Sequence, residues 1–219
     1  MANTTILYGY WLSSCTWRVR AAMHLKKMTF EERSIDIVRE KAQLTEQFRK
    51  INPSQKVPAL FVDGATIVES MAIIEYLDDT RPDPPLKPIT PLQRARMQEI
   101  CEIIVSGIQP LQNIGLKRFF ETEDKFTVFT KHWSERGLQS LEVLLKNSAG
   151  AYSVGNQMTK ADLCLVPQVY NAVTRHKLDL GKYPILSKLY EKLLKEESFR
   201  KTHPMIVKGQ KKLTLTTYQ

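Results

Sequence analysis

A proline-rich stretch at residues 81–88 constrains the fold of this chain more than any other feature. Four of its residues are proline (positions 82, 84, 85 and 88), and proline in a helix interior removes a hydrogen bond and clashes with the preceding turn. A run of this kind predicts a stiff linker. It divides the 219 residues into a domain over 1–82, a linker over 83–90 and a second domain over 91–219.

The N-terminal part alternates between strand and helix signals. Residues rich in β-branched and aromatic side chains predict strands over 6–11, 29–37, 57–62 and 66–68, and helical spacing predicts helices over 14–27, 40–50 and 70–79. Asp63-Gly64 is a strong signal for a two-residue hairpin turn between the last two strands. The order βαβα-ββα therefore predicts an α+β domain with one parallel unit and a terminal hairpin.

The C-terminal part has an all-helical pattern. Helices are expected over 91–119 with a kink at Pro110, and over 125–146, 160–175 and 184–196. Thr159 and Asp162 have the spacing of a capping box and predict a helix start. Glu142 is expected on a solvated helix face, and the residues after Pro204 are expected to be loosely ordered.

Two hydroxyls and a thiol stand where the first strand gives way to the first helix, in the sequence Ser-Ser-Cys-Thr-Trp-Arg-Val-Arg over 13–20. One interpretation is a simple helix cap, because a serine oxygen can accept a hydrogen bond from a free backbone N–H. The other is a site for an anion or a thiolate, because the helix dipole also favours negative charge there. The segment alone leaves both interpretations open.

Composition excludes several classes of function. The net charge is +9, but lysine and arginine are spread along the chain apart from a cluster at 208–212, so nucleic-acid binding is not expected. Three distant cysteines indicate a reducing compartment without disulfides, and no cysteine–histidine cluster predicts a metal site. The chain has no apolar run of membrane-spanning length and no signal-peptide pattern near its first residue, which predicts a cytosolic protein.

The chain resembles the zeta class of cytosolic glutathione transferases over nearly its whole length. The resemblance rests on the Ser-Ser-Cys sequence at 13–15, on Val57-Pro58, on Glu69-Ser70 with the helix after it, and on the segments 107–113 and 161–169. It implies a thioredoxin-like N-terminal domain followed by an all-α domain. It also implies glutathione as the cofactor and a homodimer. The charge distribution and the lack of a long apolar run predict no nucleic-acid or membrane partner.

The resemblance also assigns roles to residues. Ser13 is the expected partner of the glutathione thiolate, assisted by Ser14 and Cys15, and Arg175 is expected to bind a substrate carboxylate. The Val57–Pro58 bond is expected to be cis. The residues expected to contact glutathione are Ser13, Ser14, Cys15, Thr16, Trp17, Arg18, Gln43, Val57, Glu69, Ser70, Gln109, Asn113, Ile114 and Gly115.

Three hypotheses for function follow. The first is glutathione-dependent cis–trans isomerisation of maleylacetoacetate to fumarylacetoacetate, in phenylalanine and tyrosine breakdown. The second is a diverged transferase that conjugates or dehalogenates foreign electrophiles, and the third is a non-enzymatic binding protein. Leu12 stands where many members of the class carry arginine, Glu69 replaces a common glutamine, and the segment 171–176 is one residue longer than usual. These departures leave the identity of the electrophile open.

Overall fold

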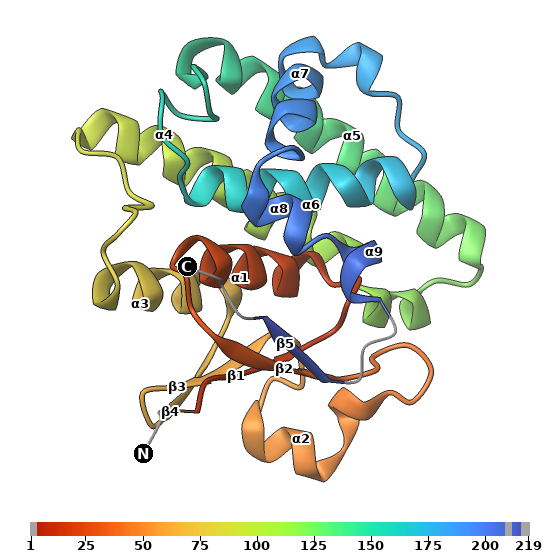
Figure 1. The fold of residues 1–219 in the computed structure, drawn as a ribbon. Helices are drawn as coiled ribbons and strands as arrows, with labels where there is room; N and C mark the ends of the chain where they lie inside the picture. Colours follow the sequence, from red (N-terminus) through yellow and green to blue (C-terminus); the bar gives the residue numbers. More distant parts are fainter. Residues whose placement is uncertain (1–3, 209–211, 216–219) are drawn as a thin grey trace. The chain divides into compact units, whose positions relative to one another are not determined.

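The chain folds into two compact units in the computed structural model, which describes residues 4–208 and 212–215 (Figure 1). The first unit contains the residues up to Pro84 together with the described residues from Glu197 onward. The second unit runs from Pro85 to Glu196. The proline-rich stretch thus coincides with the first division. The C-terminal residues, which the sequence had grouped with the helical domain, belong instead to the sheet-containing unit.

A five-stranded mixed sheet organises the first unit, in the order β4-β3-β1-β2-β5. Its strands are β1 (Ile6–Gly9), β2 (Phe30–Ser34), β3 (Ala59–Val62), β4 (Ala65–Val68) and β5 (Lys212–Leu215). β1 and β2 are parallel, whereas β1–β3, β3–β4 and β2–β5 are antiparallel. The four strands expected from the sequence are confirmed. β5 was not expected, and it adds to the edge of the sheet that β2 would otherwise leave open.

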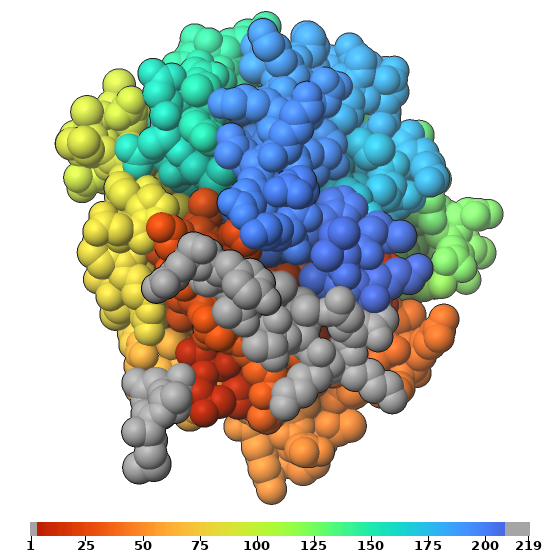
Figure 2. All heavy atoms as spheres, viewed as in Figure 1, coloured from red at the N-terminus to blue at the C-terminus, as the bar shows by residue number. Residues whose placement is uncertain are grey.

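Helices cover both faces of this sheet. They are α1 (Ser14–Leu25), η1 (Ala42–Leu44), α2 (Glu46–Ile51), α3 (Ser70–Thr80), α8 (Glu197–Lys201) and α9 (Pro204–Val207). α1 and α3 contact each other on one face and α2 lies on the other (Figure 1). The core between them is apolar and includes Leu7, Leu60 and Ile74, all fully buried. α9, in dark blue, lies at the surface in the space-filling view (Figure 2).

The second unit is helical throughout its described secondary structure, apart from one isolated β-bridge. Its helices are α4 (Pro91–Glu102), η2 (Ile103–Ile108), η3 (Pro110–Gln112), η4 (Ile114–Phe119), α5 (Glu123–Ser148), α6 (Lys160–Thr174), η5 (Leu180–Lys182) and α7 (Pro184–Leu193). The capping box at the start of α6 is confirmed: Thr159 N–H donates to Asp162 Oδ2 at 2.8 Å, and the Thr159 hydroxyl accepts from the α6 backbone.

The prediction of one kinked helix over 91–119 is wrong. The α-helix ends at Glu102, a π-helical segment continues to Ile108, and two 3-10 segments follow. The π-helical segment packs closely against α5, since a Cβ atom on Gly137 would lie only 2.2 Å from Ile108 Cδ1. The side chain of Ile108 therefore occupies the space that Gly137 leaves free.

The expectation for Glu142 is also wrong. Its side chain is buried, and its two carboxylate oxygens accept hydrogen bonds from the backbone N–H groups of Ile185 and Leu186 at 3.0 and 2.9 Å. These are the first free N–H groups of α7, so a carboxylate from α5 satisfies the start of another helix.

Within the described residues, no helix combines the length and the hydropathy needed to cross a bilayer. The same residues contain no group of three or more histidine, cysteine, aspartate or glutamate side chains arranged to hold a metal ion.

Candidate thiolate site

Ser13 begins α1 as its N-cap residue. A tight turn returns the chain from β1, with the Ser13 N–H donating to Tyr10 O at 2.9 Å. The Ser13 side-chain oxygen accepts a hydrogen bond from Thr16 N at 3.2 Å, and its carbonyl accepts from Trp17 N at 2.9 Å. The backbone of Ser13 is extended (φ −70°, ψ 120°), as an N-cap requires. The cap interpretation of this segment is confirmed.

The cap leaves the hydroxyl hydrogen of Ser13 available. A serine hydroxyl carries one donor and two acceptor positions, and the bond from Thr16 N uses only an acceptor position. The first turn of α1 contains no acidic side chain, so nothing there neutralises the positive end of the helix dipole. A half-exposed donor thus stands at a helix N-terminus, which is suitable for an anionic partner.

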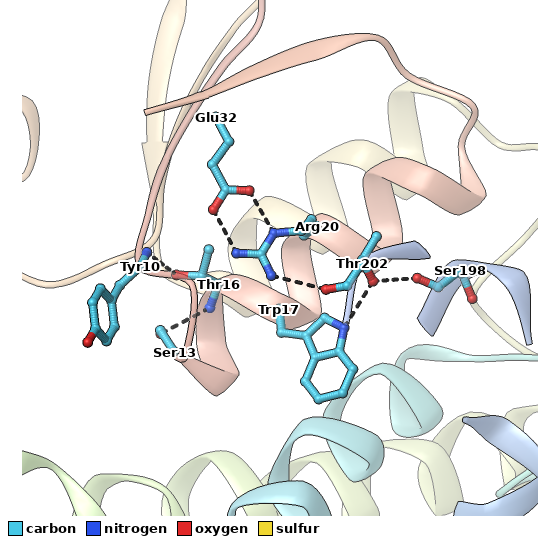
Figure 3. A network of polar contacts seen from close by, with 8 residues as sticks. All are labelled: Tyr10, Ser13, Thr16, Trp17, Arg20, Glu32, Ser198 and Thr202. Atoms are coloured by element: carbon cyan, nitrogen blue, oxygen red, sulfur yellow. Dashed lines mark hydrogen bonds and ion pairs between the residues drawn. The ribbon is translucent and has the colours of Figure 1, made fainter. Parts of the chain in front are cut away.

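The remaining residues of this segment differ in accessibility. Cys15 is half-exposed and is a free thiol, whereas Ser14 is buried as the first residue of α1. Thr16 is fully buried, and its hydroxyl accepts from Tyr10 N at 3.4 Å (Figure 3). The Trp17 side chain is also buried and its indole N–H donates to Thr202. The side chains of Thr16 and Trp17 therefore support the helix start from within the first unit.

Arg18 connects the start of α1 with the start of α3. Its Nη1 atom donates to the Ser70 hydroxyl oxygen at 3.3 Å, and both side chains are buried. Because Ser70 is the first residue of α3, its backbone N–H is one of the free donors of that helix. The positively charged guanidinium of Arg18 thus lies next to the N-terminus of α3.

Glu69 precedes that helix with unusual backbone geometry. Its φ is +68° and ψ is 118°, a combination that residues with a side chain rarely adopt. The side chain is exposed and makes no capping hydrogen bond, so simple capping does not explain the residue. The conformation holds a carboxylate beside the N-terminus of α3.

Two further predicted residues lie on the loops of the first unit. Val57 is half-buried immediately before β3, and the Val57–Pro58 peptide bond is cis as expected. Gln43 lies in η1, where its Nε2 donates to Ile37 O at 3.4 Å. Within the described part of the chain the Oε1 atom of Gln43 is buried and has no hydrogen-bond partner.

The other predicted residues belong to the second unit. Gln109 follows the π-helical segment and its backbone N–H donates to Ile104 O at 2.8 Å. Asn113 caps η4, with its Oδ1 accepting from Gly115 N at 2.9 Å. Ile114 and Gly115 are exposed. Three of the four residues therefore lie in or next to the short η3–η4 connection.

Arg175 ends α6 as its C-cap residue and its side chain is exposed. The neighbouring His176 is buried, and burial together with the charge of Arg175 lowers the pKa of this imidazole to about 4. Partial burial lowers the pKa of the Arg175 guanidinium as well, although the residue as a whole remains exposed on the second unit.

The buried polar residues that bind the side chains of α1 were not predicted from the sequence. Arg20 and Glu32 form a buried ion pair, and Thr202 binds both Trp17 and Arg20. One signal was present, since Glu32 alternates with the core residue Phe30 along β2 and therefore points to the same face.

The sequence matches two known domain families. Residues 12–80 match the family described as glutathione S-transferase, N-terminal domain, and residues 114–201 match glutathione S-transferase, C-terminal domain. The chain therefore belongs to the glutathione S-transferase family.

Individual relatives show which members of the glutathione S-transferase family the chain is similar to. The chain is 44% identical over 206 residues to probable maleylacetoacetate isomerase 1 of Drosophila melanogaster, covering 93% of this chain and 83% of the relative. It is also 44% identical over 208 residues to the maleylacetoacetate isomerase of Mus musculus, covering 93% and 94% of the two chains.

Solved structures of isomerases in this family are also similar to the chain. A maleylpyruvate isomerase described as a bacterial zeta-class glutathione S-transferase superposes with a TM-score of 0.88 at 29% identity, covering 93% of this chain and 99% of that one. A maleylacetoacetate isomerase of Anaeromyxobacter dehalogenans with glutathione bound in its active site gives a TM-score of 0.83 at 37% identity, covering 94% and 98%. The resemblance to the zeta class is confirmed.

Proposed function

We propose that this protein is a glutathione-dependent isomerase that converts maleylacetoacetate to fumarylacetoacetate, with Ser13 holding the glutathione thiolate. The observation that carries the proposal is the available Ser13 hydroxyl at the N-terminus of α1. The cap and the catalytic site are then one feature, because the serine oxygen accepts from the helix while its O–H donates outward.

Lowering the thiol pKa is the first task of the site. A free thiol has a pKa of about 8.5 and is mostly protonated at neutral pH. A hydroxyl donor and a helix N-terminus stabilise the charged form and lower that pKa. Ser13 supplies the first and α1 the second. Ser14 and Cys15 assist at the same turn.

The rest of the first unit offers groups for the peptide part of glutathione. Ser70, with Arg18 behind it, suits the γ-glutamyl carboxylate, and Glu69 suits the γ-glutamyl ammonium. The backbone of Val57 and the side chain of Gln43, which lie on loops of the same unit, are proposed to bind the peptide groups of the ligand. Each of these roles is part of the proposal.

The reaction needs only reversible addition. The glutathione sulfur forms a bond to one alkene carbon of the substrate, and the alkene electron pair moves to the conjugated carbonyl oxygen as an enolate. The former double bond now rotates. Return of the electron pair re-forms the alkene as the trans isomer and expels the thiolate, so glutathione is recovered. Donors at the helix start, including Ser13, stabilise the enolate.

Arg175 is the proposed partner of a substrate carboxylate, because it is an accessible cation on the second unit. Gln109, Asn113, Ile114 and Gly115 are proposed to line the ligand site from that unit. We further propose that the enzyme acts in the cytoplasm as a homodimer, as is typical of the family; elution as a monomer in gel filtration would contradict the dimer.

One observation favours a second candidate function. Leu12, immediately before Ser13, is half-buried and apolar at a position where many zeta-class members carry arginine. A site with one cation fewer is less suited to a dicarboxylate and better suited to a less charged electrophile. The alternative is therefore a transferase for α-halo acids or other foreign electrophiles, through the same thiolate.

A paired assay separates these functions. Purified protein is tested with glutathione for isomerisation of maleylacetone and for dechlorination of dichloroacetate, alongside Ser13→Ala and the exposed-serine control Ser54→Ala. The proposal predicts rapid isomerisation that Ser13→Ala abolishes and Ser54→Ala retains. Dechlorination without isomerisation would favour the alternative. Absence of both activities would favour a non-enzymatic binding protein.

A further inference from the structure

The described C-terminal residues hold the first turn of α1 from a distant part of the sequence. Phe199, Thr202 and His203, in and after α8, contact Trp17 of α1, and the carbonyl of Ser198 accepts a hydrogen bond from Thr202. We refer to these four residues as the C-terminal clamp. Figure 3 shows the polar part of the clamp, with Thr202 beside Trp17 and Arg20, and Ser198 next to Thr202. All of these residues belong to the first unit.

Thr202 is the centre of the clamp. Its hydroxyl accepts from the indole N–H of Trp17 at 2.9 Å and donates to the carbonyl of Ser198, and its side chain is fully buried. Its own carbonyl accepts from Arg20 Nη1 at 3.2 Å. Thr202 therefore binds two residues of α1 that lie one turn apart.

Trp17 transmits this contact to the cap. Its backbone N–H donates to Ser13 O at 2.9 Å and so closes the first turn of α1. Its ring meets Phe199 and His203 edge-on, with centroid separations of 6.2 and 5.3 Å. One residue is therefore bound to Ser13 through its backbone and to the clamp through its side chain.

A second line of contacts runs through Arg20 to the end of β1. Arg20 makes two hydrogen bonds of 2.6 Å to Glu32. A Cβ atom on Gly9 would lie 2.9 Å from Glu32 Oε1 and 2.3 Å from the Thr16 methyl, so the glycine permits both side chains to approach β1. Thr16 in turn donates its backbone N–H to Ser13 Oγ at 3.2 Å.

His203 fixes the other side of the clamp. Its Nδ1 accepts from Met205 N at 3.2 Å and so caps α9. Burial lowers the pKa of this imidazole, which keeps the ring neutral and able to accept. The ring that packs against Trp17 is therefore itself held in place.

We propose that Thr202 is a positioning residue for the thiolate site: its hydrogen bonds to Trp17 and Arg20 set the orientation of the first turn of α1 and thereby of the Ser13 hydroxyl. This inference rests on the proposed function. Its physical basis is that a hydrogen bond weakens steeply with misalignment, and a functional group has to be held within about 0.5 Å of its productive position. The C-terminal clamp therefore connects residues 198–203 with the start of α1, where the thiolate is proposed to bind.

Three variants test the role of Thr202. Thr202→Val keeps the shape of the side chain and removes its hydroxyl, and Thr202→Ser keeps the hydroxyl. Thr130→Val is a matched control, because Thr130 is also buried and also donates to a backbone carbonyl, at 3.0 Å, but lies on α5 of the second unit. For each protein the pKa of enzyme-bound glutathione is measured by ultraviolet titration of the thiolate, together with the pH profile of kcat/KM.

We expect the thiol pKa to change only when the hydroxyl of Thr202 is removed. Thr202→Val raises the bound thiol pKa by about one unit and lowers kcat/KM at neutral pH about tenfold, with the loss disappearing at alkaline pH. Thr202→Ser retains the wild-type pKa, and Thr130→Val does so despite any loss of stability. Amide hydrogen exchange at Thr16 and Trp17 is faster in Thr202→Val alone, a readout that does not depend on glutathione.

Two results would overturn the inference, and they are distinguishable. A folded Thr202→Val protein with a wild-type thiol pKa and pH profile would show that Thr202 contributes only to stability. Wild-type protein that does not lower the thiol pKa at all would refute the proposed function, and with it any role of the clamp in that function.

Discussion

Arg20→Met is expected to destabilise the first unit strongly, because it leaves a buried carboxylate without its partner. Arg20 is fully buried and the Glu32 residue is 6% exposed, with two hydrogen bonds of 2.6 Å between them. Removing one member of such a buried pair typically costs about 3–5 kcal/mol. In a chain of this size each kcal/mol corresponds to roughly 2–4 °C in Tm, so the expected decrease in Tm is roughly 6–20 °C.

A double-mutant cycle tests whether the loss of stability comes from the unpaired carboxylate of Glu32. Arg20→Met combined with Glu32→Leu replaces both charges by apolar groups, a change that is often neutral for buried pairs. The double variant is therefore expected to recover most of the stability lost in Arg20→Met. Calorimetry and circular dichroism measure both, and agreement between the two methods checks whether unfolding is cooperative.

Arg96→Met is the surface control, since Arg96 binds Glu99 at 2.8 Å in a largely exposed pair on α4. Such pairs contribute at most about 1 kcal/mol, so its Tm is expected to change little. The reasoning would be refuted if Arg20→Met were as stable as this control, or if the double variant were destabilised by the full sum of its two single changes.

Three further predictions concern other parts of the fold. The pKa of buried His176 is about 4, below its usual value near 6.5, so the folded state favours the neutral ring; this contribution is fully present above pH 6.5 and is lost as the pH falls towards 4. It amounts to at most about 3 kcal/mol and roughly half of that after screening, so His176→Gln should flatten the acid side of a stability–pH curve, and an unchanged curve would contradict this. Glu69→Gly relieves the backbone strain of the positive φ of +68°. It should raise the free energy of unfolding in urea by about 1 kcal/mol while weakening glutathione binding, and a lower free energy of unfolding would contradict the claim that Glu69 is strained. Gly137→Ala places a Cβ atom 2.2 Å from Ile108 and should cost about 1–3 kcal/mol, whereas a neutral effect in a thermal melt would show that the π-helical segment yields easily.

Local signals in the sequence predicted the parts of the fold that depend on neighbouring residues. Stretches rich in β-branched and aromatic residues predicted β1 to β4, and Asp63-Gly64 predicted the hairpin turn between β3 and β4. The Ser13 cap and the Thr159 capping box were both readable, because each depends on residues within one helical turn. The linker was readable because proline restricts the backbone wherever it occurs.

Features that depend on distant residues were not predictable in this way. β5 owes its existence to pairing with β2, which lies far away in the sequence. Glu142 looks like a surface residue of α5 until α7 supplies the N–H groups that it accepts. Likewise, nothing in the local sequence indicates that the buried indole N–H of Trp17 binds Thr202. Local sequence thus indicates the candidate ligand-binding groups, whereas the buried residues that support them depend on contacts between distant parts of the sequence.

The most direct test of the account is the pKa of the glutathione thiol when bound to the protein. Ser13→Gly is the informative variant, because glycine retains most of the N-cap preference of serine while removing the hydroxyl. We expect a thiol pKa in the wild-type complex at least about one unit below the free value near 8.5, and a return towards that value in Ser13→Gly. An equally lowered pKa in both proteins would contradict the claim that the Ser13 hydroxyl holds the thiolate.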